Sequence, residues 1–123
     1  MKITLDNGNA ENRITSYQSG SIHINGEIIS HSVIVCPGKI DTWQAVDMDS
    51  LTEDHFRKPL EYKPEILILG TGRKQCFPSQ PVWRLVAEAG AGFEIMDTAA
   101  ACRTYNVLMS EDRNVVAALL MID

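Results

Sequence analysis

Three features are scarce in this 123-residue sequence: long apolar runs, paired cysteines and an excess of basic residues. The longest apolar run, Val115 to Ile122, is far too short to cross a bilayer, and the N-terminal stretch has no apolar segment typical of a signal peptide. The three cysteines are odd in number and form no C-x-x-C motif, so neither a disulfide framework nor a zinc cluster is indicated. These absences predict a cytoplasmic protein with no membrane insertion and no bound cofactor.

The charge balance is acidic. Lysine and arginine number 11 against 16 aspartates and glutamates, which gives a formal net charge of -5. Proteins that bind nucleic acid usually concentrate basic residues on one face, so nucleic acid is not expected as a partner. With 45% hydrophobic and 22% charged residues, the composition is that of one globular domain over residues 1–123.

The first half of the sequence is typical of antiparallel β-structure. Asn25-Gly26 separates two runs rich in isoleucine and valine, Ser21–Ile24 and Glu27–Val35, and predicts a type I′ hairpin turn. A third strand is expected over Lys39–Val46, after the turn signal Pro37-Gly38.

A short helix is then expected in "SLTEDHFRKP". Ser50 and Glu53 have the spacing of a capping box, and Pro59 is expected to end the helix.

The second half alternates between strands and helices. Strands are predicted at Ile66–Leu69, Phe93–Met96 and from Val115 onward. A helix capped by Ser79 and a helix from Ala99 to about Met109 lie between them. The first helix has apolar residues at i, i+3, i+4 and i+7, namely Val82, Leu85, Val86 and Ala89. Gly90 or Gly92 is expected to end this helix, Asp97 or Thr98 to cap the second helix, and Ala101, Tyr105 and Leu108 to face the core.

The predicted fold is therefore α/β: a three-layer single domain with a mixed β-sheet. It combines a C-terminal parallel β-α-β-α-β unit with the N-terminal antiparallel hairpin.

The Gly-Thr-Gly loop is the principal candidate site. It follows a predicted parallel strand, where open α/β sheets usually bind ligands, and Arg73 and Lys74 add positive charge. The candidate anion-binding residues are Gly70, Thr71, Gly72, Arg73 and Lys74. However, Gln75 occupies the place of the third glycine of a dinucleotide fingerprint, and no Walker A lysine is present. A tight turn that requires small residues is the alternative interpretation.

Other candidate chemistry has simpler explanations. Cys102 lies near a predicted helix start, where a thiolate is favoured, but cysteine is also a common core residue. His23, His31 and His55 with Cys36 offer metal ligands. Pairing around Asn25-Gly26 does not place His23 opposite His31, so solvated or hydrogen-bonding histidines are the alternative interpretation. A solvated surface is the expected role of the acidic stretch, which contains Asp41, Asp47, Asp49, Glu53 and Asp54. Trp43 and Trp83 are interpreted as core residues or, if exposed, as parts of a protein interface.

The segments "ILILGTG", "FEIMDTAAACRTYNVL" and "EDRNVVAALLMI" together resemble a known family of small single-domain proteins without an established activity. The family includes mitochondrial complex I (NADH dehydrogenase) assembly factor three and bacterial and archaeal relatives. The resemblance implies a compact α/β fold and, for the mitochondrial relative, binding to protein partners; it implies no catalytic residues. Beyond the Gly-Thr-Gly loop, the residues that match the family pattern are Pro78, Asp97, Thr98, Ala101, Thr104, Tyr105, Asn106 and Arg113.

Two functions follow as expectations. The first is a non-enzymatic binding or assembly domain with a protein partner. The second is a small-molecule or anion-binding protein, or an enzyme, that uses the Gly70–Lys74 loop.

Overall fold

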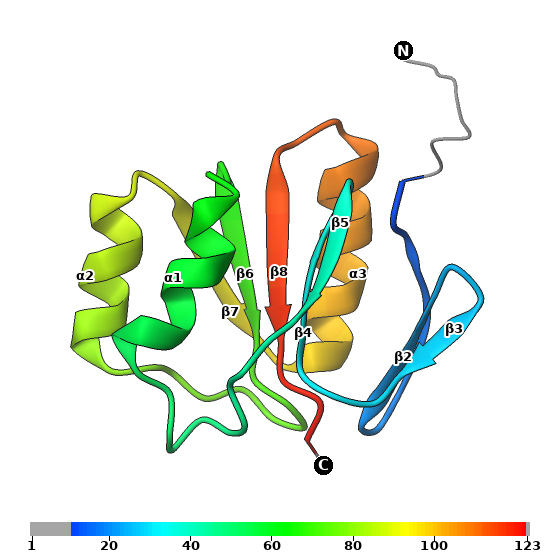
Figure 1. The fold of residues 1–123 in the computed structure, drawn as a ribbon, viewed down its shortest axis with the longest axis horizontal. Coiled ribbons are helices and arrows are strands. Elements are labelled where there is room, and N and C mark those ends of the chain that lie inside the picture. The colour runs from blue at the N-terminus through cyan, green and yellow to red at the C-terminus, as the bar shows by residue number, and fades with distance from the viewer. Residues whose placement is uncertain (1–10, 123) are drawn as a thin grey trace.

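The computed structural model describes residues 11–122, which form two β-sheets and three helices (Figure 1). The strands are β1 Ile14–Gln18, β2 Ser21–Ile24, β3 Glu27–Ile29, β4 Val33–Cys36, β5 Lys39–Thr42, β6 Ile66–Gly70, β7 Gly92–Met96 and β8 Val115–Leu119. The helices are α1 Glu53–Glu61, α2 Gln80–Glu88 and α3 Thr98–Ser110. None of the helices within residues 11–122 has the length and apolar content needed to cross a membrane.

The larger sheet has five strands in the order β5-β4-β8-β6-β7. Strands β8, β6 and β7 are parallel, as the strand–helix alternation predicts, and the β4–β5 hairpin joins them through antiparallel pairing of β4 with β8. Strands β1, β2 and β3 form a separate antiparallel sheet. The predicted mixed-sheet α/β fold is confirmed.

The five-stranded sheet forms the middle of three layers. Alternate residues of β6 and β8 enter opposite clusters: Ile68 and Ala117 pack with α3 and the three-stranded sheet, whereas Leu67 and Ala118 pack with α1 and α2. The continuous apolar runs of these strands are explained by this burial on both faces. Figure 1 shows α1 and α2 on one side of the sheet and α3 on the other.

The Asn25-Gly26 hairpin forms as expected. Asn25 and Gly26 have φ values of 54° and 80°, and Ile24 pairs with Glu27. The predicted long strand Glu27–Val35 is wrong, because it is divided between two sheets at the polar segment 30–32. The strand expected over Lys39–Val46 ends at Thr42. Alternation indicates extended backbone but does not reveal when a chain leaves one sheet for another.

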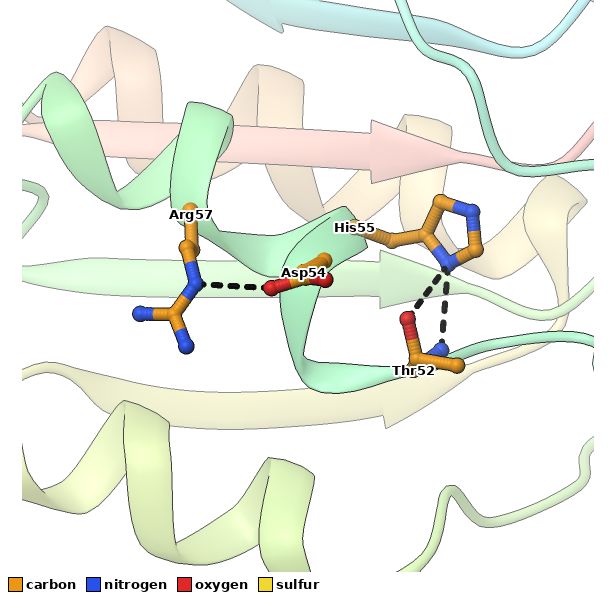
Figure 2. Close-up of polar contacts among 4 residues, drawn as sticks. All are labelled: Thr52, Asp54, His55 and Arg57. Atoms are coloured by element: carbon orange, nitrogen blue, oxygen red, sulfur yellow. Dashed lines mark hydrogen bonds and ion pairs between the residues drawn. The ribbon is translucent and has the colours of Figure 1, made fainter.

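Helix α1 begins differently from the prediction. Its N-cap is Thr52, and His55 rather than a glutamate returns the capping interaction: His55 Nδ1 accepts a hydrogen bond from the Thr52 N–H at 3.0 Å. Figure 2 shows the imidazole turned toward Thr52, and the neighbouring pair of Arg57 with Asp54 at 2.9 Å. The capping box predicted for Ser50 and Glu53 is therefore wrong: the N-cap is Thr52, and the His55 imidazole takes the role that a glutamate usually has at the third helical position.

Pro59 lies inside α1 and does not end it. A proline at this position cannot donate the helical hydrogen bond to the carbonyl of His55. The Trp43 indole N–H donates to that carbonyl instead, at 2.7 Å. Trp43 is 3% exposed and contacts the Phe56 ring edge-on, so it both satisfies the free carbonyl and fills the core.

The other two helix starts agree with the sequence. Ser79 is the N-cap of α2, although its side chain makes no capping hydrogen bond, and Asp97 caps α3 by accepting from the Ala100 N–H at 2.8 Å. Gly90, with φ 79°, follows the C-cap of α2. Of the residues expected to face the core from α3, Ala101 and Tyr105 are buried and Leu108 is half-buried.

Candidate functional site

The Gly-Thr-Gly loop leaves the carboxyl end of β6, beside the segment that leaves β7. The first segment leads to α2 and the second to α3, on opposite faces of the sheet. Such a divergence of neighbouring connections is the usual position of a ligand crevice in an open α/β sheet. The loop therefore lies where a ligand would bind. Its polar contacts show whether its backbone groups are free to bind one.

Thr71 connects the two segments. Its backbone N–H donates to the Met96 carbonyl at 2.9 Å, and its hydroxyl lies 2.6 Å from the Lys74 carbonyl and 3.2 Å from the Met96 carbonyl. The side chain is 2% exposed. Thr71 thus stabilises the turn with both its backbone and its hydroxyl.

Thr98 completes this connection from the first residue of α3. Its hydroxyl donates to the Leu120 carbonyl at 2.8 Å and accepts from the Gly72 N–H at 2.8 Å. Its own N–H donates to the Gly72 carbonyl at 2.9 Å, and the side chain is fully buried. One hydroxyl therefore joins the ends of β6 and β8 to the start of α3.

The two glycines are required for different reasons. A Cβ at Gly70 would lie 2.9 Å from Leu119 Cδ2 and 3.0 Å from Thr98 Oγ1. Gly72 has φ +98°, and a Cβ there would lie 2.6 Å from Ile122 Cγ1. Close approach excludes a side chain at the first position, and both close approach and a left-handed backbone exclude one at the second.

The backbone N–H groups of the loop are consequently already hydrogen-bonded within the protein. The N–H groups of Thr71 and Gly72, which an anion cradle would present to a phosphate, already donate to Met96 and Thr98. The charged pair that follows, Arg73 and Lys74, is exposed. An anion would therefore meet these two side chains rather than a backbone nest.

A pocket of about 660 Å³ opens beside the loop. Its walls carry two cations and two carboxylates together with apolar and sulfur-containing side chains; the lining residues are Asp47, Met48, Asp49, Thr71, Arg73, Lys74, Cys76 and Ile122. The predicted ligand role of the Gly70–Lys74 loop stays a prediction. The sequence did not indicate the contribution of Ile122, because only the fold brings the residue after β8 to this loop.

A second set of the predicted site residues lies away from the pocket, on α3. Asn106 Oδ1 accepts from the Ile14 N–H at 3.1 Å, and its Nδ2 donates to the Ile14 carbonyl at 2.6 Å. The Tyr105 hydroxyl donates to the Asn12 carbonyl at 2.6 Å. These two side chains attach the N-terminal strand to α3 and do not converge with Thr71 or Thr98 on one site.

The remaining predicted residues are dispersed. Arg113 pairs with Glu65 at 2.9 Å, and this pairing holds the pKa of the Glu65 carboxyl below its usual value. Pro78 and Thr104 are half-buried. Asp97 caps α3 next to Thr98, so the family pattern comprises a loop network, the attachment of β1 and a surface ion pair.

Cys102 has the environment of a core thiol. It is 4% exposed, and burial raises its pKa to about 12 despite the nearby Arg103. Burial also raises the pKa of the half-buried Cys36. A raised pKa disfavours the thiolate that nucleophilic or redox chemistry would use near neutral pH.

The structure also shows the environments of the candidate metal ligands, the acidic residues and the two tryptophans. Within residues 11–122, no group of three or more histidine, cysteine or acidic side chains is arranged to hold a metal ion. Asp54 pairs with Arg57, and Asp41 accepts a hydrogen bond from Tyr62. Trp83 is 40% exposed, whereas Trp43 is buried.

Comparison with known proteins gives the family. Residues 14–120 match the family described as "Protein of unknown function (DUF498/DUF598)". The chain belongs to this family. Its predicted relationship is thus confirmed, and the matched region includes all eight strands and three helices described above.

Named relatives of this family differ in their descriptions. A Francisella tularensis protein called "13 kDa major membrane protein" is 31% identical over 106 residues, which cover 85% of this chain and 86% of the relative. The human NADH dehydrogenase [ubiquinone] 1 alpha subcomplex assembly factor 3 is 32% identical over 109 residues, covering 87% of this chain and 59% of the relative. The match thus spans less than two thirds of the human assembly factor's length.

Solved structures support the family fold. A Bordetella parapertussis protein superposes with a TM-score of 0.86 at 38% identity, covering 91% of this chain and 97% of that one. A Xanthomonas campestris protein gives 0.86 at 31% identity, covering 98% and 92%. A Bartonella henselae structure described as an outer membrane protein gives 0.80 at 29% identity, covering 93% and 98%.

Proposed function

We propose that this chain is a non-enzymatic binding domain that acts on a protein partner, in the manner of an assembly factor. The observation that carries the proposal is the internal pairing of the Gly-Thr-Gly loop, whose backbone donors bind Met96 and Thr98 where a catalytic α/β domain would present them to a substrate. The names of the animal relatives as complex I assembly factors support a protein partner.

A tagged version of the full chain, expressed at its native level, tests this function. Affinity capture followed by quantitative mass spectrometry is expected to recover a defined protein in stoichiometric amount, with subunits of a respiratory complex as the first candidates. Recovery of the chain alone under gentle conditions, together with turnover of a metabolite, would reject the proposal.

We infer a cytoplasmic location for this activity from the composition of the chain. The Francisella and Bartonella relatives, whose descriptions refer to membranes, make the compartment worth a direct measurement. Fractionation of native cells is expected to place the chain in the cytosolic fraction. Retention in a carbonate-washed membrane fraction would contradict this expectation.

A second candidate function is favoured by the pocket beside the loop. Its volume of about 660 Å³ lies in the range of small-molecule sites, and Arg73 and Lys74 would bind an anionic group of the ligand. A panel of phosphorylated metabolites is expected to raise the melting temperature of the wild type but not of Arg73→Ala/Lys74→Ala. The matched control is Lys58→Ala/Arg84→Ala, which removes two exposed cations elsewhere.

A further inference from the structure

We infer that β7 is a docking edge for an extended segment of a partner protein, which pairs antiparallel to it with a basic residue opposite Glu94. The inference rests on the proposed protein-binding function and assigns it a surface. β7 forms one end of the five-stranded sheet, with β6 as its single neighbouring strand within residues 11–122 (Figure 1).

The ladder between β6 and β7 determines which backbone groups point outward. The Gly92 N–H donates to the Glu65 carbonyl, and the Met96 carbonyl accepts from the Thr71 N–H, each at 2.9 Å. In a parallel pair, every second residue directs both backbone groups toward the neighbour. Gly92, Glu94 and Met96 therefore face β6, and Phe93 and Ile95 present their backbone groups on the open side.

A side chain confirms this direction for Ile95. Gln75, in the loop after β6, donates from Nε2 to the Ile95 carbonyl at 3.0 Å. This amide occupies the position that an N–H of an added strand would take. Within residues 11–122, no hydrogen bond is made by the N–H groups of Phe93 and Ile95 or by the Phe93 carbonyl. The edge therefore offers two donors and one acceptor, and a second acceptor that an incoming strand can take from Gln75.

The negative charge of Glu94, at the middle of the edge, favours a partner strand with a basic residue. Glu94 is exposed and lies between the two outward-facing residues. In antiparallel pairing, the residue opposite Glu94 would be a close, non-hydrogen-bonded neighbour, so a lysine or arginine there is attracted and an acidic residue is repelled. A second copy that paired symmetrically about Glu94 would place two carboxylates opposite each other. The charge thus disfavours self-pairing in this register and suits a basic segment, in agreement with the net charge of -5.

The neighbouring surface suits side chains of an added strand. The Trp83 ring, 40% exposed on α2, contacts the Phe93 ring at 5.2 Å with an interplanar angle of 67°. It extends the apolar surface from Phe93 toward solvent. Side chains that alternate with the basic residue of the partner would pack on this aromatic pair.

The first test uses two capped nine-residue peptides of alternating threonine and valine, one with lysine and one with glutamate at its centre. The lysine peptide is expected to slow amide exchange at Phe93 and Ile95, and to bind about three- to tenfold more tightly than the glutamate peptide. Glu94→Lys should invert this preference, whereas Glu27→Lys, an equal charge change at an exposed position on β3, should not. Gln75→Ala should strengthen lysine-peptide binding by about two- to tenfold because it frees the Ile95 carbonyl.

Three results would overturn the inference: no exchange protection at Phe93 and Ile95 at millimolar peptide, equal binding of both peptides, or protection that depends on protein concentration without peptide. The last result would identify a second copy as the occupant.

Capture from native cells separates this inference from the proposed function. A partner bound by wild type and Glu27→Lys but lost from Glu94→Lys supports both. A partner retained equally by all three proteins leaves the function standing and overturns the edge. Recovery of no partner by the wild type overturns both.

Discussion

At the residue scale, Thr71 and Thr98 do for this loop what a bound anion does in nucleotide-binding folds: they satisfy its backbone. The Gly72 N–H, the Lys74 carbonyl and the Leu120 carbonyl all pair with threonine hydroxyls. Because hydroxyls both donate and accept, two uncharged side chains connect segments that a charged ligand would otherwise connect.

Gly70→Ala should destabilise the protein. The new methyl would lie 2.9 Å from Leu119 Cδ2 and 3.0 Å from Thr98 Oγ1, so the surrounding core must shift. We expect the free energy of unfolding, measured by urea denaturation, to fall by about 1–3 kcal/mol. Gly38→Ala is the control, because a Cβ there meets no atom within 4 Å. Equal effects of the two substitutions would contradict the close packing at Gly70.

Cys102 should make the protein less stable in alkali. Its pKa rises from 9.0 in the reference state to about 12 in the fold because of burial. Below pH 9 the thiol is protonated in both states; above it, the unfolded chain loses this proton first, so stability falls as pH rises toward 12. The slope due to this group is at most about 1.4 kcal/mol per pH unit.

The measurement is the unfolding free energy of wild type and Cys102→Ala between pH 8 and 11. The wild type should lose stability more steeply, since the variant has no thiol at this position. Parallel curves would show that Cys102 ionises equally readily in both states. Cys76→Ala, at a half-buried site, is the control.

At the element scale, α1 continues through a proline because a side chain from another segment compensates for the missing donor. The Trp43 indole N–H takes the place of the absent backbone N–H at position 59, with the His55 carbonyl as acceptor. Trp43→Phe should cost about 1–3 kcal/mol for the unsatisfied carbonyl, in addition to lost packing.

A double-mutant cycle isolates this contribution. In a Pro59→Ala background, the new backbone N–H can donate to His55, so Trp43→Phe should cost about 1 kcal/mol less than it does in the wild type. Additive effects of the two substitutions in chemical denaturation would show that the indole hydrogen bond does not substitute for the helical one.

Prediction from sequence succeeded where the cause was local. The Asn25-Gly26 turn and the Asp97 cap depend on residues a few positions apart, and the individual strands and helices of the parallel unit follow from patterns within each segment. It failed at α1, because the hydrogen bond that compensates for Pro59 comes from Trp43, which lies outside the helix and twelve positions before its acceptor, His55. It also gave no indication of β1, which is mostly polar and is attached by Asn106 from the opposite end of the chain.

The candidate site divides in the same way. The glycines and the threonine of the loop were identified from sequence, and so was their position after a parallel strand. The hydrogen-bond acceptor of the Gly72 N–H is Thr98, twenty-six positions away. The sequence could not show that this donor is occupied, because only the fold brings the two residues together.

At the scale of the whole molecule, the two sheets are connected through α3. Asn106 binds both backbone groups of Ile14, and so attaches the three-stranded sheet to the helix that covers the larger one. Asn106→Ala should increase amide exchange in β1 and β2 by about tenfold or more, with little change in β6 and β8. Hydrogen-exchange mass spectrometry measures both regions at once.

Ser110→Ala on the same helix is the control, since its hydroxyl donates to the local Val107 carbonyl. A uniform increase over both sheets in Asn106→Ala would show that the molecule opens as one unit.

The central place of β8 has a consequence for synthesis on the ribosome. β8 pairs with β4 on one side and β6 on the other, yet it is the last of the described strands to be translated. At roughly 5–20 residues per second, β4 leaves the ribosome several seconds before its central partner exists. The nascent chain must therefore carry the unpaired apolar edges of β4 and β6 until β8 has been translated, which makes it a natural client for chaperones that shield β-strands.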